Sequence, residues 1–371
     1  MKGVGQARIM AHGGDRYRNR VDYDFSINVN PLGIPLILRK AMEQGIENAG
    51  YYPDPLQEAS RRAAAEFYGE RAGVSLPPEW MIPGNGASEL IMAVVKGISP
   101  KKVLIPRPCF TGYLRAVRGN REDREGGDCE KDAIEWEKDL PDRIGPDTGL
   151  VILTNPGNPT GSLMDSVLLH TLLEKAKACH TPVLIDECFI EFTGKEAESG
   201  LNLQREFPNV LVLRAFTKIF AMPGVRSGCL ICPDQELRSK IRMALPEWNL
   251  SSFAEAVLAA AGEHRSEIYA FMDETVRETT RLRNSMEERI RRGGFGDIRV
   301  FPSCTNYLLT TGWNLPGRRL FEELLHRGIL VRSCEDMPPL TEDHIRLAVR
   351  PEAEQEMLFT ALTEILPRIL G

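Results

Sequence analysis

One lysine and one arginine stand eight positions apart in an otherwise mostly apolar stretch, AFTKIFAMPGVRSG, which spans residues 215–228. Apolar surroundings disfavour an ammonium ion, so we expect them to lower the pKa of Lys218 and to keep more of its amine nucleophilic. Arg226 carries a planar, permanently charged guanidinium that suits phosphate and carboxylate oxygens. The stretch thus holds an amine and a guanidinium close together in apolar surroundings. A lysine that merely ended a strand at the surface would explain neither the arginine nor the neighbouring motifs.

Polar or aromatic residues also follow other apolar runs. NPGNPTG follows LVIL, Asp186 follows PVLI, and the strand that begins at residue 103 leads into PRPCFTGY. In open α/β sheets, ligands bind at the carboxyl ends of the strands. We therefore expect Phe110, Asn158, Asp186 and Lys218 to converge on a single crevice.

The strands and helices that must position these residues can be predicted from the alternation of apolar runs and turn residues. Short aliphatic runs begin at residues 103, 150, 182, 210 and 228 and are bounded by Pro, Gly, Asn or Asp, as is typical of buried strands. Residues 165–180 lie between two of them and are apolar at helical spacing, with Asp165 as a candidate cap. This βαβ pattern predicts an α/β fold with a mostly parallel central sheet flanked by helices.

The chain of 371 residues exceeds the usual size of one domain. From residue 251 to residue 292 the pattern becomes long, helical and highly charged, and a mixed α/β tail follows. We predict a large domain formed by residues 40–248. Residues 1–39 and 249–371 are predicted to form an N-terminal arm and a smaller α/β domain.

Four motifs, NPGNPTG, IDECF, TKIFAMPGVRSG and HIRLAVR, occur in this order along the chain. Together they resemble the fold-type I enzymes that use pyridoxal 5'-phosphate (PLP), the aspartate aminotransferase superfamily. The likeness runs from NVNPLG, which begins at residue 28, to the C-terminal arginine motif. It implies PLP as the cofactor, a large domain with a mostly parallel sheet, and a smaller α/β domain.

The resemblance assigns roles around the cofactor. Lys218 would bond covalently to the cofactor aldehyde and later move protons at the substrate's α-carbon. Asp186 would pair with the protonated pyridine nitrogen, whereas the simpler alternative is an aspartate that caps a turn. Asn158 would donate to the phenolic oxygen, and Arg226 would bind the phosphate.

Further cofactor contacts are implied around a glycine turn. Gly86, Ala87 and Ser88 stand where a helix opens, so that backbone N–H groups could hold the phosphate, although many such turns are plain helix starts. Thr217 would add a hydroxyl, and Phe110 would stack on the cofactor ring unless it is an ordinary core aromatic.

Two positions depart from the family pattern. Where many relatives have a tyrosine that donates to the cofactor's phenolic oxygen, this chain has Phe189. Where a Ser or Thr often touches the phosphate, it has Ala215, which leaves Thr217 as the remaining hydroxyl in that turn. We therefore expect the cofactor ring to receive one hydrogen bond fewer and the cofactor phosphate to be bound more weakly.

Substrate recognition is predicted from two arginines and the N-terminal arm. The resemblance places Arg346 on the substrate α-carboxylate and Arg332 on a distal phosphate, although each could instead be structural. The arm HGGD could fold over an anion near Asn28, the alternative being a disordered terminus. The predicted substrate-binding residues are His12, Gly13, Asn28, Asn158, Arg332 and Arg346.

Two branches of the superfamily compete. HGGD, followed by DFSINVNPLGIP, resembles the start of L-threonine-O-3-phosphate decarboxylases, the cobalamin-pathway enzymes that form (R)-1-amino-2-propanol phosphate. Histidinol-phosphate aminotransferases share the architecture and the arginine pair. The α-carbon bond held perpendicular to the cofactor ring is the one that breaks, and the sequence does not show which bond that is. We favour the decarboxylase-like branch.

The remaining features exclude other classes. The net charge is -6 and the lysines and arginines are scattered, so the chain has no basic patch that would bind nucleic acid or an anionic membrane. We expect a cytoplasmic protein without a bound metal. Cys229 and Cys232 form a C-x-x-C, but within a strand-like run they are expected in the core. A PLP-binding regulator would need a DNA-binding module, for which the chain has no basic patch.

Tyr52 matches a tyrosine of the family that reaches the cofactor of the neighbouring subunit. This match predicts a homodimer with shared active sites.

Overall fold

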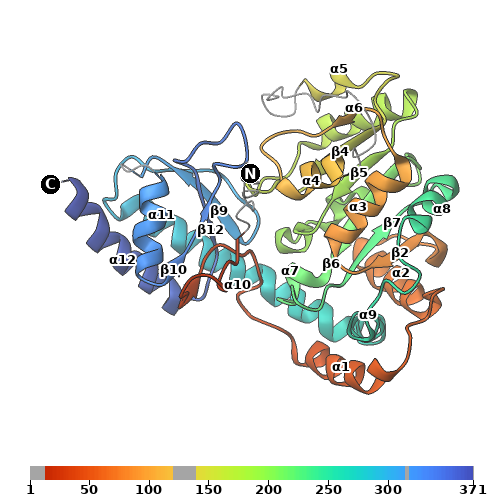
Figure 1. Ribbon diagram of the computed structural model, residues 1–371, viewed down its shortest axis with the longest axis horizontal. Coiled ribbons are helices and arrows are strands. Elements are labelled where there is room, and N and C mark those ends of the chain that lie inside the picture. The colour runs from red at the N-terminus through yellow and green to blue at the C-terminus, as the bar shows by residue number, and fades with distance from the viewer. Residues whose placement is uncertain (1–12, 120–138, 314–316, 371) are drawn as a thin grey trace, which may run out of the picture.

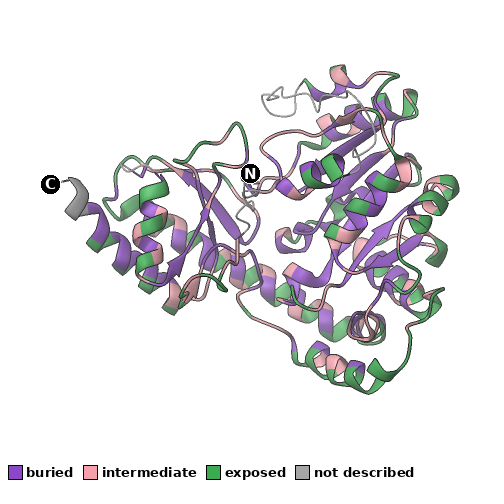
Figure 2. Ribbon diagram, viewed as in Figure 1, coloured by how far each residue is buried: buried purple, intermediate pink, exposed green. Residues whose placement is uncertain are grey.

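The computed structural model describes residues 13–119, 139–313 and 317–370. Within these ranges the chain forms a larger body around a six-stranded sheet and a smaller body around a four-stranded sheet, with the helix α10 running from one to the other (Figure 1). Figure 2 shows that the strands of both sheets are buried, whereas exposed residues gather on the outer faces of the helices.

The six-stranded sheet is mostly parallel. Its strands, in spatial order, are β2 (Met81–Gly84), β7 (Gly228–Ile231), β6 (Val210–Ala215), β5 (Val183–Asp186), β4 (Leu150–Thr154) and β3 (Val103–Leu104). The four strands β3 to β6 run parallel to one another, and β7 runs antiparallel to both of its neighbours. Because parallel strands are covered on both faces, their sequences are continuous aliphatic runs rather than alternating ones.

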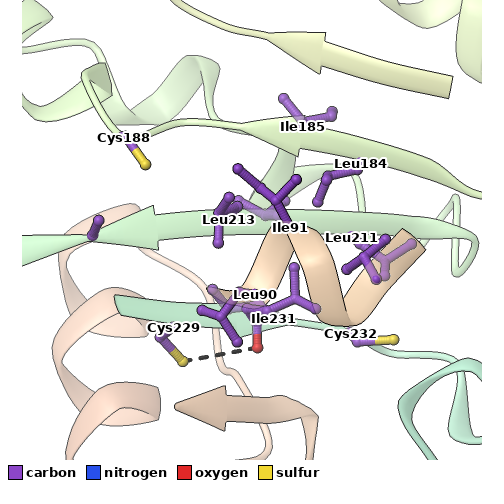
Figure 3. Packing of buried hydrophobic residues seen from close by; sticks show 14 of the residues in the cluster. Leu90, Ile91, Leu184, Ile185, Cys188, Leu211, Leu213, Cys229, Ile231 and Cys232 are labelled. Carbon is purple, nitrogen blue, oxygen red and sulfur yellow. Dashed lines mark hydrogen bonds between the residues drawn. The ribbon is translucent and has the colours of Figure 1, made fainter. Parts of the chain in front are cut away.

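Helices cover this sheet. They are α1 (Leu36–Glu47), α2 (Glu58–Ala72), α3 (Ala87–Ile98), α4 (Thr111–Gly119), α5 (Leu140–Arg143), α6 (Ser166–Ala178), α7 (Phe216–Ile219), α8 (Gln235–Met243), α9 (Ser252–Glu263) and the start of α10 (Arg265–Arg292). Short 3-10 helices lie at Asn48–Gly50, Pro78–Trp80, Ile190–Thr193, Glu196–Glu198 and Gly200–Asn202. The helix α3 lays Leu90 and Ile91 against side chains of β6 and β7 (Figure 3).

The smaller body combines an antiparallel sheet with two helices and a two-stranded pairing. Its elements are β1 (Tyr23–Asp24), β8 (Arg299–Val300), β9 (Tyr307–Thr311), α11 (Gly317–His326), β10 (Ile329–Leu330), β11 (Arg332–Ser333), β12 (Ile345–Ala348) and α12 (Glu352–Leu370). The sheet order is β11-β12-β9-β8, and β1 pairs in parallel with β10. The N-terminal segment thus returns to the C-terminal part of the chain.

Two large hydrophobic clusters correspond to the two bodies. The first includes Leu258 of α9 and Met272 of α10 beside the strands of the large sheet. The second joins Met286 of α10 to Leu347 and α12. Apolar residues of α9 and of the first half of α10 therefore pack with the larger body, and the predicted domain limits, 40–248 against 1–39 and 249–371, stay a prediction.

Most of the predicted elements are confirmed. All five aliphatic runs form strands, and α6 occupies the predicted crossover with the Asp165 side chain accepting from Leu168 N at 3.0 Å. The sequence reading missed β2, because its four residues carry no alternation or β-branched run strong enough to mark a strand. In the described part of the chain, no helix is long and apolar enough to cross a membrane.

Candidate active site

A cavity of about 380 Å³ opens at the carboxyl ends of the parallel strands and is closed on its other side by β11 and β12. The predicted residues in its lining are Gly13, Asn28, Ala87, Ser88, Phe110, Asn158, Asp186, Thr217, Lys218, Arg226, Arg332 and Arg346. Four strand ends therefore meet in one crevice, as the sequence predicted. The roles assigned to these residues stay predictions.

Lys218 lies in the single turn of α7, directly after β6. The backbone N–H of Asn30 donates to the Lys218 carbonyl at 3.0 Å, and the Asn30 side chain donates to the carbonyl of Ile219 at 2.7 Å, so the turn is held from a distant segment. Burial, together with Arg346 and Arg226, lowers the pKa of Lys218 to about 8. The amine is therefore far more available as a nucleophile than that of a surface lysine.

Asp186 ends β5 on the cavity floor and accepts two hydrogen bonds. Its Oδ1 accepts from Cys188 N at 3.0 Å, and its Oδ2 accepts from the Tyr113 hydroxyl at 2.7 Å. Burial raises the pKa of Tyr113 well above its ordinary value, so the phenol keeps its proton and donates. Burial also raises the pKa of the Asp186 carboxyl despite these donors, because a carboxylate is costly away from water, and a cationic partner in the cavity would offset that cost.

Sequence reasoning missed Tyr113 and its neighbour Thr154, whose Oγ1 lies 2.9 Å from the Tyr113 oxygen. Tyr113 is visible in PRPCFTGY, three residues after Phe110, but its partners come from β4 and β5. No local pattern could have shown that pairing. Arg115, two residues further along α4, also lines the cavity and was not predicted.

Arg226 lies against the N-terminus of α3. The residue adopts φ +59°, and its Nη1 donates to the carbonyl of Pro223 at 3.1 Å. A Cβ atom at Gly86 would lie 2.7 Å from Arg226 Nη2, so only glycine allows this approach, and Gly86 itself has φ +87°. Among the described residues, no carboxylate forms an ion pair with Arg226. Its guanidinium and the N–H groups of the helix start therefore form a site for an anion.

Asn158 and Arg346 are brought together from the two bodies. Arg346 Nη1 donates to Asn158 Oδ1 at 2.6 Å, and Nη2 donates to the carbonyl of Ser26 at 2.8 Å. Arg346 Nε and Asn28 Oδ1 are buried without a hydrogen-bond partner among the described residues. Burying such groups unpaired is costly, so these two atoms indicate that a polar ligand belongs in the cavity.

Arg332 stands directly opposite Arg346 in the register of β11 and β12. It also lines the cavity, and its Nη2 lies 2.8 Å from both carboxylate oxygens of Asp336. The predicted phosphate-binding arginine is thus already paired with a carboxylate of this chain. Sequence reasoning did not single out Asp336.

The described start of the arm lies on the cavity wall. Gly14 N donates to Ser26 Oγ at 2.7 Å, and a Cβ at Gly13 would lie 2.4 Å from the Ser26 carbonyl oxygen. Only glycine allows the arm to approach so closely. His12, the predicted imidazole of the clamp, lies outside the described residues.

Three further positions singled out in the sequence are Tyr52, Phe189 and Ala215. Tyr52 is 81% exposed and does not line its own chain's cavity; its ring packs at a tilt against Trp248, with ring centroids 4.8 Å apart. Phe189 lines the cavity and packs edge-on against Tyr307. Ala215 is buried at the end of β6 and does not line the cavity. The described cysteines are free, and among the described residues no group of His, Cys, Asp and Glu side chains could hold a metal ion.

The fold and this cavity define an α/β enzyme of the aspartate aminotransferase type, with an amine, a buried carboxylate and anion-binding arginines at the carboxyl ends of a parallel sheet. The family model described as aminotransferase class I and II matches residues 22–365. The chain belongs to this family, whose members are PLP-dependent.

Particular relatives refine this placement. The chain is 29% identical to the threonine-phosphate decarboxylase of Salmonella typhimurium over 93% of its own length and 92% of that protein. It superimposes on the histidinol-phosphate aminotransferase of Clostridium acetobutylicum with a TM-score of 0.80 and 28% identity, covering 93% of this chain and 99% of the other. An aspartate aminotransferase variant of Thermus thermophilus matches at a TM-score of 0.79 and 21% identity, over 95% and 93% of the two chains, and supports the fold alone.

Family membership implies PLP, and the residues present are suited to it. A phosphate matches the pairing of Arg226 with the start of α3, a cationic pyridine nitrogen matches the buried Asp186, and an aldehyde matches the depressed pKa of Lys218. The cavity is therefore chemically complementary to the cofactor that the family uses.

Proposed function

We propose that the chain is a PLP-dependent enzyme acting on a phosphorylated amino acid. Its proposed reaction is the decarboxylation of L-threonine-O-3-phosphate to (R)-1-amino-2-propanol phosphate, a step of cobalamin biosynthesis. The proposal rests on the class of the protein, which is a decarboxylase or an aminotransferase, and on the charge distribution in its cavity.

The charge imbalance of the cavity is the observation that carries the proposal. Among the described residues in its lining, the cationic side chains are Arg115, Lys218, Arg226, Arg332 and Arg346, and the only carboxylate is that of Asp186. One cofactor phosphate would engage Arg226 but would leave Arg346 without an anion and Arg332 with only Asp336 of this chain. A substrate with a carboxylate and a second anionic group would satisfy both.

The chain's own residues have defined tasks in this proposal. When bound, PLP supplies an electron sink for a bond broken at the substrate's α-carbon. Asp186, held by Tyr113 and Cys188, would keep a cationic ring nitrogen charged, and Asn158 would donate to the phenolic oxygen. The neutral amine of Lys218 would accept or return the proton at the α-carbon.

Arg346 and Arg332 would orient the substrate. Arg346, with its buried Nε unpaired, would bind the α-carboxylate and so set which α-carbon bond can break. Arg332, beside it in the sheet register, would attract the distal phosphate. The arm at Gly13, pressed against Ser26, would cover the same end of the cavity and exclude water.

Transamination of histidinol phosphate is the second candidate. The likeness to the Clostridium acetobutylicum aminotransferase favours it, since that chain is matched over nearly its whole length at 28% identity. The same arginine pair would serve both substrates.

Incubation of the purified, PLP-loaded protein with O-phospho-L-threonine, and separately with histidinol phosphate plus 2-oxoglutarate, tests the proposal. We expect carbon dioxide from the first mixture and little glutamate from the second. Glutamate without carbon dioxide would establish the aminotransferase instead. Turnover of L-threonine at the rate of its phosphate ester would contradict a phosphorylated substrate.

A further inference from the structure

Asp336 forms an ion pair with Arg332, the arginine that the proposed function assigns to the substrate's distal phosphate. Arg332 is only 6% exposed, and its Nη1 donates to the Ser333 carbonyl at 2.7 Å. Its Nη2 contacts both oxygens of Asp336 at 2.8 Å. The guanidinium facing the cavity is therefore already neutralised by a carboxylate four residues further along the chain.

The choice of nitrogen matters for ligand binding. A guanidinium can grip a phosphate or carboxylate through two parallel N–H bonds, along either its Nε–Nη2 edge or its Nη1–Nη2 edge. Nη2 belongs to both edges, and it is the nitrogen that Asp336 holds. Nη2 has one N–H on each edge, so a substrate anion that pairs with either edge of Arg332 would lie beside the Asp336 carboxylate and compete with it for that nitrogen.

We infer that Asp336 is a specificity-determining residue that competes with the substrate's distal anion for Arg332. In the absence of that anion, the carboxylate neutralises one of the two adjacent cations on β11 and β12. A substrate phosphate must compete with this carboxylate for Arg332 and is repelled by its charge, so Asp336 weakens binding of phosphorylated substrates without affecting substrates that lack the second anionic group. This inference rests on the proposed function, because it takes the second anion to be the substrate's.

The surroundings of Asp336 are suited to such a competition. Its side chain is 22% exposed and lies in the loop that joins β11 to β12, where it can turn toward solvent. Among the described residues, its side-chain hydrogen bonds and ion pair are those with Arg332. Arg332, in contrast, is held at the sheet by the Ser333 carbonyl and by its register opposite Arg346. The carboxylate is therefore the more mobile member of the pair.

The variant Asp336→Asn tests the inference, because it keeps the shape of the side chain and removes its charge. Calorimetric titration of the PLP-loaded protein with inorganic phosphate measures binding without turnover, and titration in a Lys218→Ala background, which has little activity, gives the dissociation constants of O-phospho-L-threonine and L-threonine. We expect the dissociation constants of phosphate and O-phospho-L-threonine to fall by about tenfold, the scale for removing one partly buried competing charge, while binding of L-threonine changes less than about twofold.

Glu335→Gln is the matched control, since it removes the same charge from the exposed neighbouring residue. It should change each dissociation constant by less than about twofold, because an exposed charge is screened. In an Arg332→Gln background, Asp336→Asn should have no effect. If Asp336→Asn instead weakened phosphate binding, the carboxylate would be orienting Arg332 rather than competing for it, and the inference would be wrong.

The titrations also separate this inference from the proposed function. If inorganic phosphate binds more tightly to Asp336→Asn but neither phosphorylated substrate is turned over, the competition is supported and the proposed reaction fails. If O-phospho-L-threonine is decarboxylated and Asp336→Asn leaves all dissociation constants unchanged, the reaction stands and the competition is refuted.

Discussion

At the residue scale, the protonation of Lys218 sets a pH dependence. Burial beside two arginines lowers the pKa of its amine to about 8. Only the neutral amine attacks an aldehyde, so below that pH the ammonium form withholds the nucleophile. We therefore predict that the rate at which cofactor-free protein captures PLP covalently rises with pH, with a midpoint near 8, and then levels off. Stopped-flow absorbance of the bound cofactor measures this rate.

Borohydride reduction followed by peptide mapping identifies the lysine that is modified, and Lys218→Arg serves as the control without covalent capture. A midpoint near 10.5, the ordinary lysine value, would show that the cavity does not perturb the amine. Modification of another lysine would overturn the assignment itself.

Tyr113 is a positioning residue through its bond to Asp186. The hydroxyl donates at 2.7 Å to the carboxylate proposed to face the cofactor ring. A hydrogen bond to a charged group is worth about 1.5–3 kcal/mol, so Tyr113→Phe should weaken PLP binding by about 10- to 100-fold and shift the pH titration of the bound cofactor's absorbance. Equilibrium titration of cofactor-free protein with PLP measures the affinity.

Tyr269→Phe is the matched control for that variant, because the Tyr269 hydroxyl donates at 2.6 Å to the Phe67 carbonyl, outside the cavity. Its loss should lower thermal stability but leave the PLP affinity and the absorbance titration unchanged. Equal effects of the two variants on PLP binding would mean that Tyr113 serves the fold and not Asp186.

At the scale of elements, the start of α3 depends on a single glycine. Gly86 has φ +87°, and a Cβ there would lie 2.7 Å from Arg226 Nη2. Gly86→Ala should therefore displace the guanidinium from the helix start and raise the dissociation constant of PLP at least about tenfold. Pyridoxal, which lacks the phosphate, should bind the variant and the unaltered protein nearly equally. Fluorescence titration with the two cofactors gives both affinities.

Gly73→Ala separates this effect from backbone strain. Gly73 ends α2 with φ +70°, yet nothing lies within 4 Å of a Cβ there. Gly73→Ala should lower the free energy of unfolding by about 1–2 kcal/mol, the cost of a left-handed alanine, and Gly86→Ala should lower it by about 1–3 kcal/mol, because φ +87° with ψ 165° is essentially restricted to glycine. Only Gly86→Ala should lose PLP. A loss of pyridoxal affinity equal to that of PLP would show that the site as a whole had collapsed.

At the scale of the whole molecule, the exposed Tyr52 beside Trp248 supports a dimer. Tyr51, Tyr52 and Trp248 are all exposed, and neighbouring exposed aromatic side chains mark interaction surfaces. Enzymes of this family typically dimerise. We predict a symmetric dimer in which Tyr52 of each chain completes the other chain's cavity. Light scattering should report twice the mass of one chain.

Subunit mixing tests the shared sites. Lys218→Ala and Tyr52→Ala proteins should each have little activity, but a mixed dimer contains one cavity with both native residues. Mixing after mild dissociation should therefore restore up to about one quarter of the native activity, because half of a statistical population is mixed and half of its sites are intact. Absence of recovery from demonstrably mixed dimers would place Tyr52 outside the neighbouring site.

The sequence by itself determined the class of this protein. Aliphatic runs, the Asp165 cap and the motifs around Asn158, Asp186 and Lys218 depend on local periodicity and on turn chemistry, which act within a few residues of the chain. They sufficed to predict the α/β fold, the family and the meeting of four strand ends in one cavity.

Only the tertiary structure decided how the side chains in that cavity are paired. The bond from Tyr113 to Asp186 crosses 73 residues, and the bond from Arg346 to Asn158 crosses 188. Such pairs depend on the register of strands and the packing of two bodies, which local patterns do not encode. Asp336 lies only four residues from Arg332, yet their contact depends on the path of a loop that the packing around β11 and β12 selects.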